Sequence, residues 1–210
     1  MIDLDTARAC LAALASARGV SVVEPDEAAG YLDGAATLLS LIPGAGPIVA
    51  QLRAPLDDAQ ERVSVTAPLP WGTTILLSRS AVVDGPSYLS TGLHELVHVR
   101  QIETVGALQS AADYLGSGEL RAMREAEASG IGLWGRYVVT GELPAVDDAS
   151  ILRSSLYHLD APDHAFARAV VEGLVASASV GARPPHSVAR DALAWLHANA
   201  PRAIAVEAYR

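Results

Sequence analysis

The sequence predicts an α+β fold that is predominantly α-helical, with a small sheet packed beside two long helices. Apolar residues recur at helical spacing over most of the chain, and glycine and proline separate these periodic segments. Only a few short stretches are rich in the β-branched residues that strands favour. The chain has 210 residues, of which 50% are hydrophobic, so it is long enough to bury a core. We therefore expect one compact domain overall.

Residues 1–70 are predicted to form an N-terminal helical region. Residues 3–18 have the apolar spacing of a helix that ends at Gly19. Residues 26–41 are predicted to form a second helix. The most apolar run, 38–52, is broken by prolines and glycines and is shorter than the roughly 20 residues that a membrane-spanning helix needs. We expect no membrane span. The sequence assigns no role to this region, and covering a cleft is one interpretation.

Three short segments are candidates for the sheet. VSVVE (20–24) and RVSVTA (62–67) resemble short strands, the second by its alternation of apolar and polar residues. TTILLSR (73–79) is the best candidate, because it combines β-branched and aliphatic residues between Gly72 and a turn. We expect residues 73–79 to be an edge strand packed on the helix that follows, and to offer that edge to an extended substrate.

Two long helices are predicted in the middle of the chain. The first begins near Ser87 or Ser90, either of which can cap it, and runs to about Gly106. The second opens after the glycine-rich stretch 116–118 and continues to about Val139. These two helices are expected to carry the functional residues.

The C-terminal region, residues 146–210, is predicted to be helical in two or three pieces. Residues 164–178 form one apolar periodic segment and residues 188–200 form another. The stretch GARPPHS (181–187) separates them, because its glycine and prolines interrupt a helix. The sequence assigns no function to this region.

Charge and cysteine content exclude several classes of protein. The chain has 24 acidic residues, 15 arginines and no lysine, which gives a net charge of −9. Binding nucleic acid requires a basic patch, and none is visible along the sequence, so no nucleic-acid partner is expected. The single Cys10 cannot form an intrachain disulfide. The N-terminus lacks the basic segment of a signal peptide, so we expect a cytoplasmic protein.

The segment GLHELVHVRQ (92–101) contains the motif H-E-x-x-H. Residues four apart lie on one face of a helix, so His94 and His98 can both bind one metal ion. Glu95 is rotated by about 100° from His94 and can take a proton from metal-activated water. The alternative is a chance match on an ordinary helix. The neighbouring leucines and valines favour a buried helix, in which such polar groups without a metal carry a desolvation cost.

A third ligand is expected on the second long helix, because a catalytic zinc usually has three protein ligands and one open position. Glu125 and Glu127 are the candidates. Glu127 falls near the centre of a stripe of bulky apolar residues, so periodicity alone favours it. Glu125 lies on the opposite side with Ala128, Ser129 and Gly132, small residues that would let the two helices approach closely. The ordinary alternative for either glutamate is a solvated surface charge.

HELVHVRQ followed downstream by REAEAS resembles the gluzincin zinc metallopeptidases, in particular their minimal bacterial and phage-associated members. In that family the third ligand begins the pattern Glu-x-x-Ala-Asp or Glu-x-x-Ala-Asn. This pattern selects Glu125 and Ala128, and Ser129 stands where an acidic or amide residue is expected. The resemblance covers residues 73–132 and implies a zincin-like metal-binding core within residues 71–145.

The resemblance implies a peptide-bond hydrolase that acts on a peptide or protein substrate. Zn²⁺ would be bound by His94, His98 and Glu125, with Glu95 as the general base. A second hypothesis is a non-proteolytic assembly or interaction protein that retains a structural zinc site, and a third is a helical domain with no zinc. Three tyrosines are candidates for the oxyanion donor that such peptidases often need: Tyr114, Tyr137 and Tyr157. Substrate preference and oligomeric state are not predicted.

Overall fold

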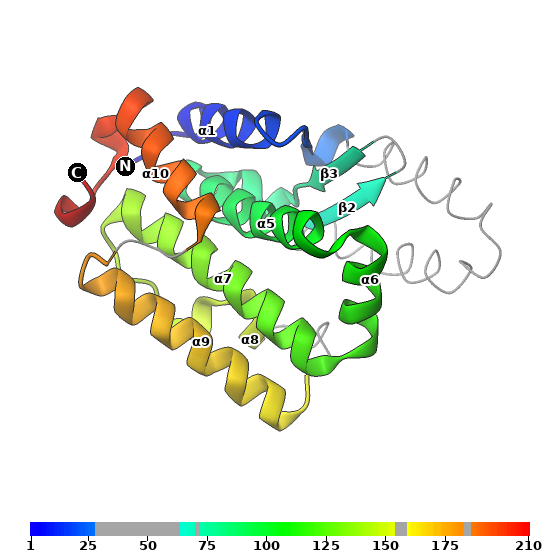
Figure 1. Cartoon of the computed structure of the whole chain (residues 1–210). Coiled ribbons are helices and arrows are strands. Elements are labelled where there is room, and N and C mark those ends of the chain that lie inside the picture. The colour runs from blue at the N-terminus through cyan, green and yellow to red at the C-terminus, as the bar shows by residue number, and fades with distance from the viewer. Residues whose placement is uncertain (28–63, 70–71, 154–158, 183–185) are drawn as a thin grey trace.

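The computed structural model is mostly helical, with a small sheet at one end (Figure 1). The predicted α+β fold class is therefore confirmed. The structure describes residues 1–27, 64–69, 72–153, 159–182 and 186–210. The helix predicted over 26–41 and the apolar run 38–52 lie almost wholly outside these ranges. No helix within them combines the length and apolar character needed to cross a membrane.

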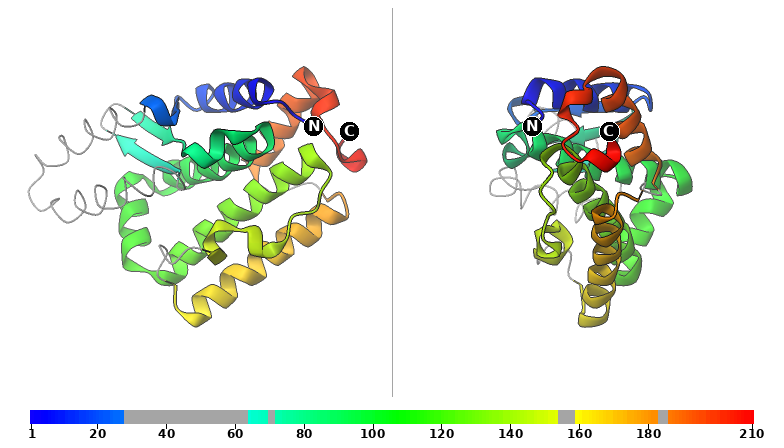
Figure 2. Two further views of the ribbon diagram at one scale, coloured as in Figure 1. Left: turned by 180° about the vertical axis from the view of Figure 1, so that it is seen from behind. Right: turned by 90° about the vertical axis from the view of Figure 1, so that its left-hand side faces the viewer.

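Four helices that pack side by side in a row form the body of the described chain. They are α1 (Leu4–Ser16), α5 (Gly85–Val105), α7 (Gly118–Thr140) and α9 (Ala161–Ser179). Helix α5 lies between α1 and α7, and α7 lies between α5 and α9 (Figure 1). Helix α10 (Ser187–Asn199) packs against α1 and α5, and both chain ends lie at the same end of the molecule (Figure 2). The helices predicted near residues 3–18, 164–178 and 188–200 are confirmed.

The sheet has three strands in the order β1-β3-β2. The middle strand β3 (Gly72–Leu76) is parallel to β1 (Ser21–Val23) and antiparallel to β2 (Val65–Leu69). The prediction of a strand within 73–79 is confirmed, but its expected position at the edge is wrong because a strand pairs with each of its sides. The edge strand that packs on α5 is β2. It contains Pro68, which has no backbone N–H and so suits an edge.

Helix α5 begins earlier than its serines predicted. The Asp84 carboxylate accepts a hydrogen bond from the Ser87 backbone N–H at 2.7 Å, and Pro86 occupies the first turn. Asp84 is therefore the cap, and the prediction of Ser87 or Ser90 is wrong. Ser90 instead lies inside the helix, where its hydroxyl donates to the carbonyl oxygen of Gly132 on α7 at 2.9 Å.

Helix α6 (Ala107–Gly116) is an element that the sequence did not predict. It starts directly after Gly106, whose φ of 85° ends α5. Ser117 separates it from α7 and caps α7 by accepting from the Leu120 backbone N–H at 3.2 Å. Helix α6 contacts both long helices and runs across from one to the other (Figure 1). It therefore adds residues to one end of the α5–α7 contact.

Helices α5 and α7 approach closely along the stripe of small residues. A Cβ atom added at Gly132 would lie 2.8 Å from the carbonyl oxygen of Ser90 and 3.5 Å from the Cβ atom of His94. Ala128 and Ser129 on the same stripe are buried. The close approach expected from these residues is therefore confirmed, and Gly132 has no room for a side chain.

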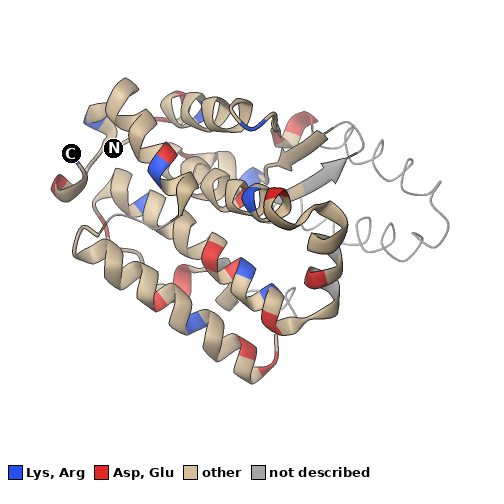
Figure 3. Ribbon diagram, in the orientation of Figure 1, with Lys and Arg blue, Asp and Glu red and all other residues tan. Residues whose placement is uncertain are grey.

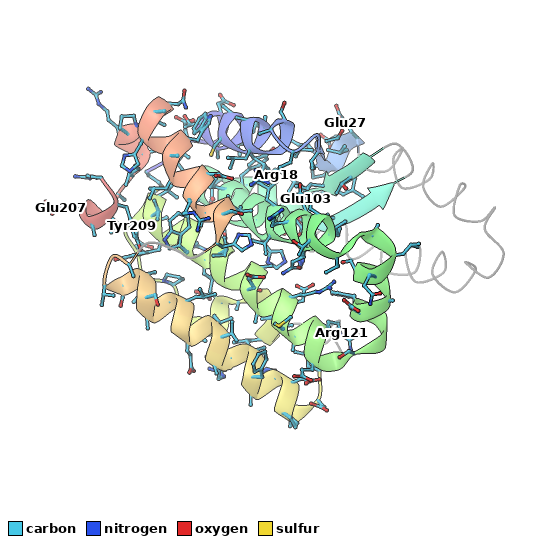
Figure 4. The ribbon with its side chains drawn as sticks, in the orientation of Figure 1. Arg18, Glu27, Glu103, Arg121, Glu207 and Tyr209 are labelled. Atoms are coloured by element: carbon cyan, nitrogen blue, oxygen red, sulfur yellow. The ribbon has the colours of Figure 1, made fainter. Side chains whose placement is uncertain are left out.

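The other face of α7 is covered by α8 (Ser150–Arg153) and α9, which form a second apolar cluster with it. The C-terminal segment, which carries Tyr209, returns to the end of α7 that lies away from α6 (Figure 4). The ring of Tyr209 lies edge-on to Trp134 with 5.8 Å between centroids. Four short 3-10 helices belong to the described chain: Arg79–Val83, Val146–Asp148, Pro201–Ala203 and Glu207–Tyr209. Helix α7 is thus buried on two sides, which fixes its position against α5.

Replacing Gly132 by alanine is expected to lower the free energy of unfolding by roughly 1–3 kcal/mol, because the new methyl group meets backbone atoms of α5. Gly173→Ala in α9 is the matched control, since nothing lies within 4 Å of its added Cβ atom. That control should gain about 0.5–1 kcal/mol. Denaturant titrations measure both changes, and equal effects at the two sites would contradict the close contact.

Candidate metal centre

The contact between α5 and α7 brings His94, His98 and Glu125 together. Their potential ligand atoms all lie within 4.8 Å of one another, so the group could hold a metal ion. The histidines are one turn apart on α5, and Glu125 faces them from α7. The side chain of Glu125 is 5% exposed, and those of His94 and His98 are 14% and 16% exposed. The three residues that the sequence predicted as ligands are thus neighbours in the structure.

The spacing of these atoms fits a tetrahedral ion. The two Nε2 atoms are 3.1 Å apart, Glu125 Oε2 is 3.5 Å from His94 Nε2, and Glu125 Oε1 is 3.4 Å from His98 Nε2. Two ligands bound tetrahedrally at the usual zinc distances of about 2.0–2.1 Å are separated by about 3.3 Å. The side chains therefore need little rearrangement to share one ion.

The Glu125 carboxylate has one bonded oxygen and one orphaned oxygen. Its Oε1 atom accepts a hydrogen bond from the Tyr114 hydroxyl at 2.8 Å. Its Oε2 atom is buried and accepts no hydrogen bond from the part of the chain that the structure describes, and His94 Nε2 faces it at 3.5 Å. Buried polar atoms without a partner are rare in native proteins and call for an explanation such as an ion. A cation among the three side chains would satisfy this oxygen.

Tyr114 is the candidate tyrosine that the structure places at this site. Arg121 on α7 holds it in two ways, because its Nη1 donates to the Tyr114 carbonyl oxygen at 2.6 Å and its guanidinium lies over the ring at 5.8 Å. Figure 4 marks Arg121 on α7 near its junction with α6. Tyr137 packs against the main apolar core, and Tyr157 lies outside the described residues. Tyr114 thus lies at the site as a partner of Glu125, and the oxyanion donor among the three tyrosines stays a prediction.

A buried ion pair fixes α6, which carries Tyr114, against α7. The Arg124 Nη2 donates to Asp113 Oδ2 at 2.6 Å, and its Nη1 donates to the Ser110 hydroxyl and carbonyl oxygens at 2.8 and 3.1 Å. Acidic and basic residues are interspersed along α7 and α9 (Figure 3), but this pair is more buried than most. Because both charges are bonded, the pair ties the short helix to the long one.

Glu95 lies beside the three-residue cluster without being part of it. It is only 3% exposed. The Thr66 hydroxyl of β2 lies 2.8 Å from Glu95 Oε2 and 3.0 Å from the Glu95 carbonyl oxygen. The sequence did not predict a role for Thr66, because a strand pattern does not say which helix the strand will meet. The edge strand therefore holds the carboxylate that the motif nominates as the base.

Glu127 is outside the cluster but is linked to it. Its Oε2 atom accepts from Gln101 Nε2 at 3.0 Å, and Gln101 Oε1 lies 2.9 Å from His98 Nδ1. The structure places Glu125, and not Glu127, among the converging side chains, which goes against the preference of periodicity for Glu127. Gln101 was not predicted at the site either, although its position three residues after His98 places it on the same helix face.

Charge holds the three side chains together when no metal is bound. Burial opposes a charged imidazole, but the Glu125 carboxylate outweighs it and, with a smaller contribution from Glu95, raises the pKa of His98 to about 9. Burial likewise opposes ionisation of Glu125, yet the two histidines bring the pKa of its carboxyl well below the usual range. A metal ion binds neutral imidazole, so it must compete with a proton here and binds less tightly as the pH falls.

No protein-family model, curated protein or solved structure matches this chain. The fold and the site define a mostly helical protein with a three-residue group able to hold a metal ion. Its function must therefore be argued from the geometry of that group and of the side chains around it.

The two glutamates on α7 should respond differently to removal. Glu125→Ala is expected to abolish zinc binding, because it removes a ligand atom. Glu127→Ala should retain zinc with an affinity lower by about 10–100-fold, since Glu127 is linked to the cluster through Gln101. Zinc titration of the two variants against a competing chelator measures both affinities, and the reverse order would mean that Glu127 is the ligand.

Removing the hydroxyl of Tyr114 should weaken the metal site without unfolding the protein. Tyr114→Phe leaves Glu125 Oε1 without its donor, and we expect zinc affinity to fall by about 10-fold or more. Tyr137→Phe removes the same hydroxyl from a tyrosine in the apolar core and serves as the control. The same chelator competition compares them. Equal zinc affinity in the Tyr114 variant and the wild type would contradict a positioning role for this hydrogen bond.

Proposed function

We propose that the protein is a zinc-dependent peptidase of gluzincin type, which hydrolyses peptide bonds in a peptide or protein substrate. The observation that carries this proposal is the spacing of His94, His98 and Glu125, whose facing atoms are separated by 3.1–3.5 Å. Structural zinc sites have four protein ligands, whereas catalytic sites have three and an open position. The cluster found among the described residues has three members, which supports the catalytic alternative over a structural clip.

The donor set favours zinc over other common ions. Two imidazole nitrogens and one carboxylate oxygen are typical of catalytic zinc, whereas magnesium and calcium prefer oxygen ligands throughout. When bound, zinc supplies a Lewis acid that polarises a carbonyl oxygen and lowers the pKa of water. His94, His98 and Glu125 would hold it, and Tyr114 would keep the Glu125 carboxylate turned toward the histidines.

Glu95 supplies the proton chemistry of the proposed reaction. It takes a proton from the attacking water as the water oxygen bonds to the substrate carbonyl carbon. It then returns that proton to the amide nitrogen as the C–N bond breaks, which releases an amine and a carboxylic acid. The Thr66 hydroxyl bonds to Oε2 and so fixes the plane of the carboxylate. Oε1 is then the atom that exchanges the proton.

The substrate is proposed to lie along β2. Among the described residues this strand pairs with β3 on one side only, and its Thr66 bonds to Glu95. An extended peptide can add to such an edge through main-chain hydrogen bonds, which would place a scissile bond near Glu95. The sequence predicted that residues 73–79 would offer an edge to the substrate. We assign this role to β2 instead, because β3 lies inside the sheet.

Replacing Glu95 by glutamine tests the proposal. Glu95→Gln keeps the size of the side chain and all three ligands but cannot accept the proton, so cleavage of a peptide library should slow by about 10²–10⁴-fold. Zinc content should stay at the wild-type level. Glu103→Gln on the same helix is the control, because Glu103 pairs with Arg100 away from the cluster. Mass spectrometry of the peptide products measures the rates.

Two outcomes would contradict the proposal. Cleavage by Glu95→Gln at the wild-type rate would mean that Glu95 is not the base. Zinc-loaded wild-type protein that cleaves no member of a broad peptide library would favour the non-proteolytic protein with a structural zinc site.

A further inference from the structure

We infer that Gln101 is a positioning residue for His98: it determines which ring nitrogen of His98 carries the proton, so that Nε2 presents its lone pair to the ligand cluster. This inference rests on the metal site of the proposed function but not on peptidase activity. It assigns a role to a side chain that neither the H-E-x-x-H motif nor the downstream glutamate pattern contains.

Gln101 lies on α5 three residues after His98, with its side chain half-buried between α5 and α7. Its Oε1 atom is 2.9 Å from His98 Nδ1. Its Nε2 atom is 3.0 Å from Glu127 Oε2 and 3.1 Å from the carbonyl oxygen of Arg124. One amide group therefore contacts the histidine at one end and two oxygen atoms of α7 at the other.

The chemistry of those two oxygen atoms fixes the orientation of the amide. A carboxylate and a main-chain carbonyl can only accept hydrogen bonds. If the amide of Gln101 were turned over, its own oxygen would face both of them without any proton between. The NH₂ group must therefore point to α7, and the amide oxygen must point to His98. This removes the usual ambiguity between amide oxygen and nitrogen.

The amide oxygen in turn fixes the tautomer of His98. It can only accept a hydrogen bond, so His98 Nδ1 must carry a proton. In the neutral ring the lone pair is then on Nε2, the atom that lies 3.1 Å from His94 Nε2 and 3.4 Å from Glu125 Oε1. The opposite tautomer would direct an N–H bond into the cluster. The hydrogen-bonded chain from α7 to His98 thus prepares the nitrogen that a metal needs.

The partner of His98 lies on the same helix as the histidine itself. Gln101 supplies an amide oxygen to His98 from α5, the helix that carries both histidines. Outer partners of this kind typically change metal affinity by about 10–100-fold when they are removed.

The test is zinc affinity in the full chain, measured by competition with a chelator. Gln101→Leu keeps a similar size and helix preference but has no polar atoms, and it should bind zinc about 10–100-fold more weakly than the wild type. Gln109→Leu is the matched control, because Gln109 is an exposed glutamine on α6 whose side chain bonds to Asp113. It should bind zinc like the wild type. The melting temperatures of the metal-free proteins should differ little.

A second variant separates positioning from general damage. Gln101→Glu with Glu127→Gln exchanges the two side chains, so that an oxygen still accepts from His98 Nδ1 and an amide still donates between the two positions. The exchange loses the hydrogen bond to the Arg124 carbonyl oxygen, so it should recover part of the affinity lost in Gln101→Leu. In metal-free wild type at a pH above the pKa of His98, about 9, nitrogen-15 NMR of the neutral imidazole rings should show His98 protonated at Nδ1. In metal-free Gln101→Leu under the same conditions, a larger share of His98 should be protonated at Nε2.

The possible outcomes separate the role of Gln101 from the metal site itself. If the wild type binds zinc and Gln101→Leu binds it equally well, the role of Gln101 is overturned and the metal site stands. The role is likewise overturned if Gln109→Leu loses as much affinity as Gln101→Leu, or if NMR shows His98 protonated at Nε2. If the wild type binds no zinc, the site and the inference fail together.

Discussion

The close contact between α5 and α7 is the constraint on which the rest of the site depends. Packed helices lie about 8–10 Å apart, and the side chains at the contact set the distance. Here Gly132 has no side chain, and the Ser90 hydroxyl bonds directly to its carbonyl oxygen. The histidines of α5 and the carboxylate of α7 can therefore approach within 3.5 Å.

Each of the other elements at the site fixes one atom of this arrangement. Strand β2 holds the Glu95 carboxylate through Thr66, and α6 holds the Glu125 carboxylate through Tyr114. Helix α7 provides the anchors of α6 and, through Glu127, of Gln101. Polar groups that are buried without partners are costly, so their pairing keeps the ligand side chains in a single geometry without a metal. A site prepared in this way can bind an ion with little reorganisation.

The sequence predicted features that depend on residues close together in the chain. The positions of most helices and the shared face of His94 and His98 follow from a period of 3.6 residues. Glu125 was selected by its small neighbours and by the family pattern. Features that depend on distant partners were not predictable in this way. The edge position of β2 and the reach of Thr66 to Glu95 require the order of the strands. Helix α6, in contrast, is amphipathic, so its pattern was a local signal that was missed. The Asp84 cap is a local feature, but Ser87 and Ser90 are also residues that cap helices, and the prediction chose them instead.

The proposed chemistry requires that α5 and α7 share one zinc ion, and native mass spectrometry after reconstitution with zinc shows directly whether they do. The wild-type chain should carry one zinc ion, because three side chains supply a tetrahedral site with one open position. The His98→Ala variant, analysed at the same protein concentration, should carry none. A wild-type chain that stays free of metal, or a variant that binds zinc as well as the wild type does, would contradict a zinc site shared by the two helices.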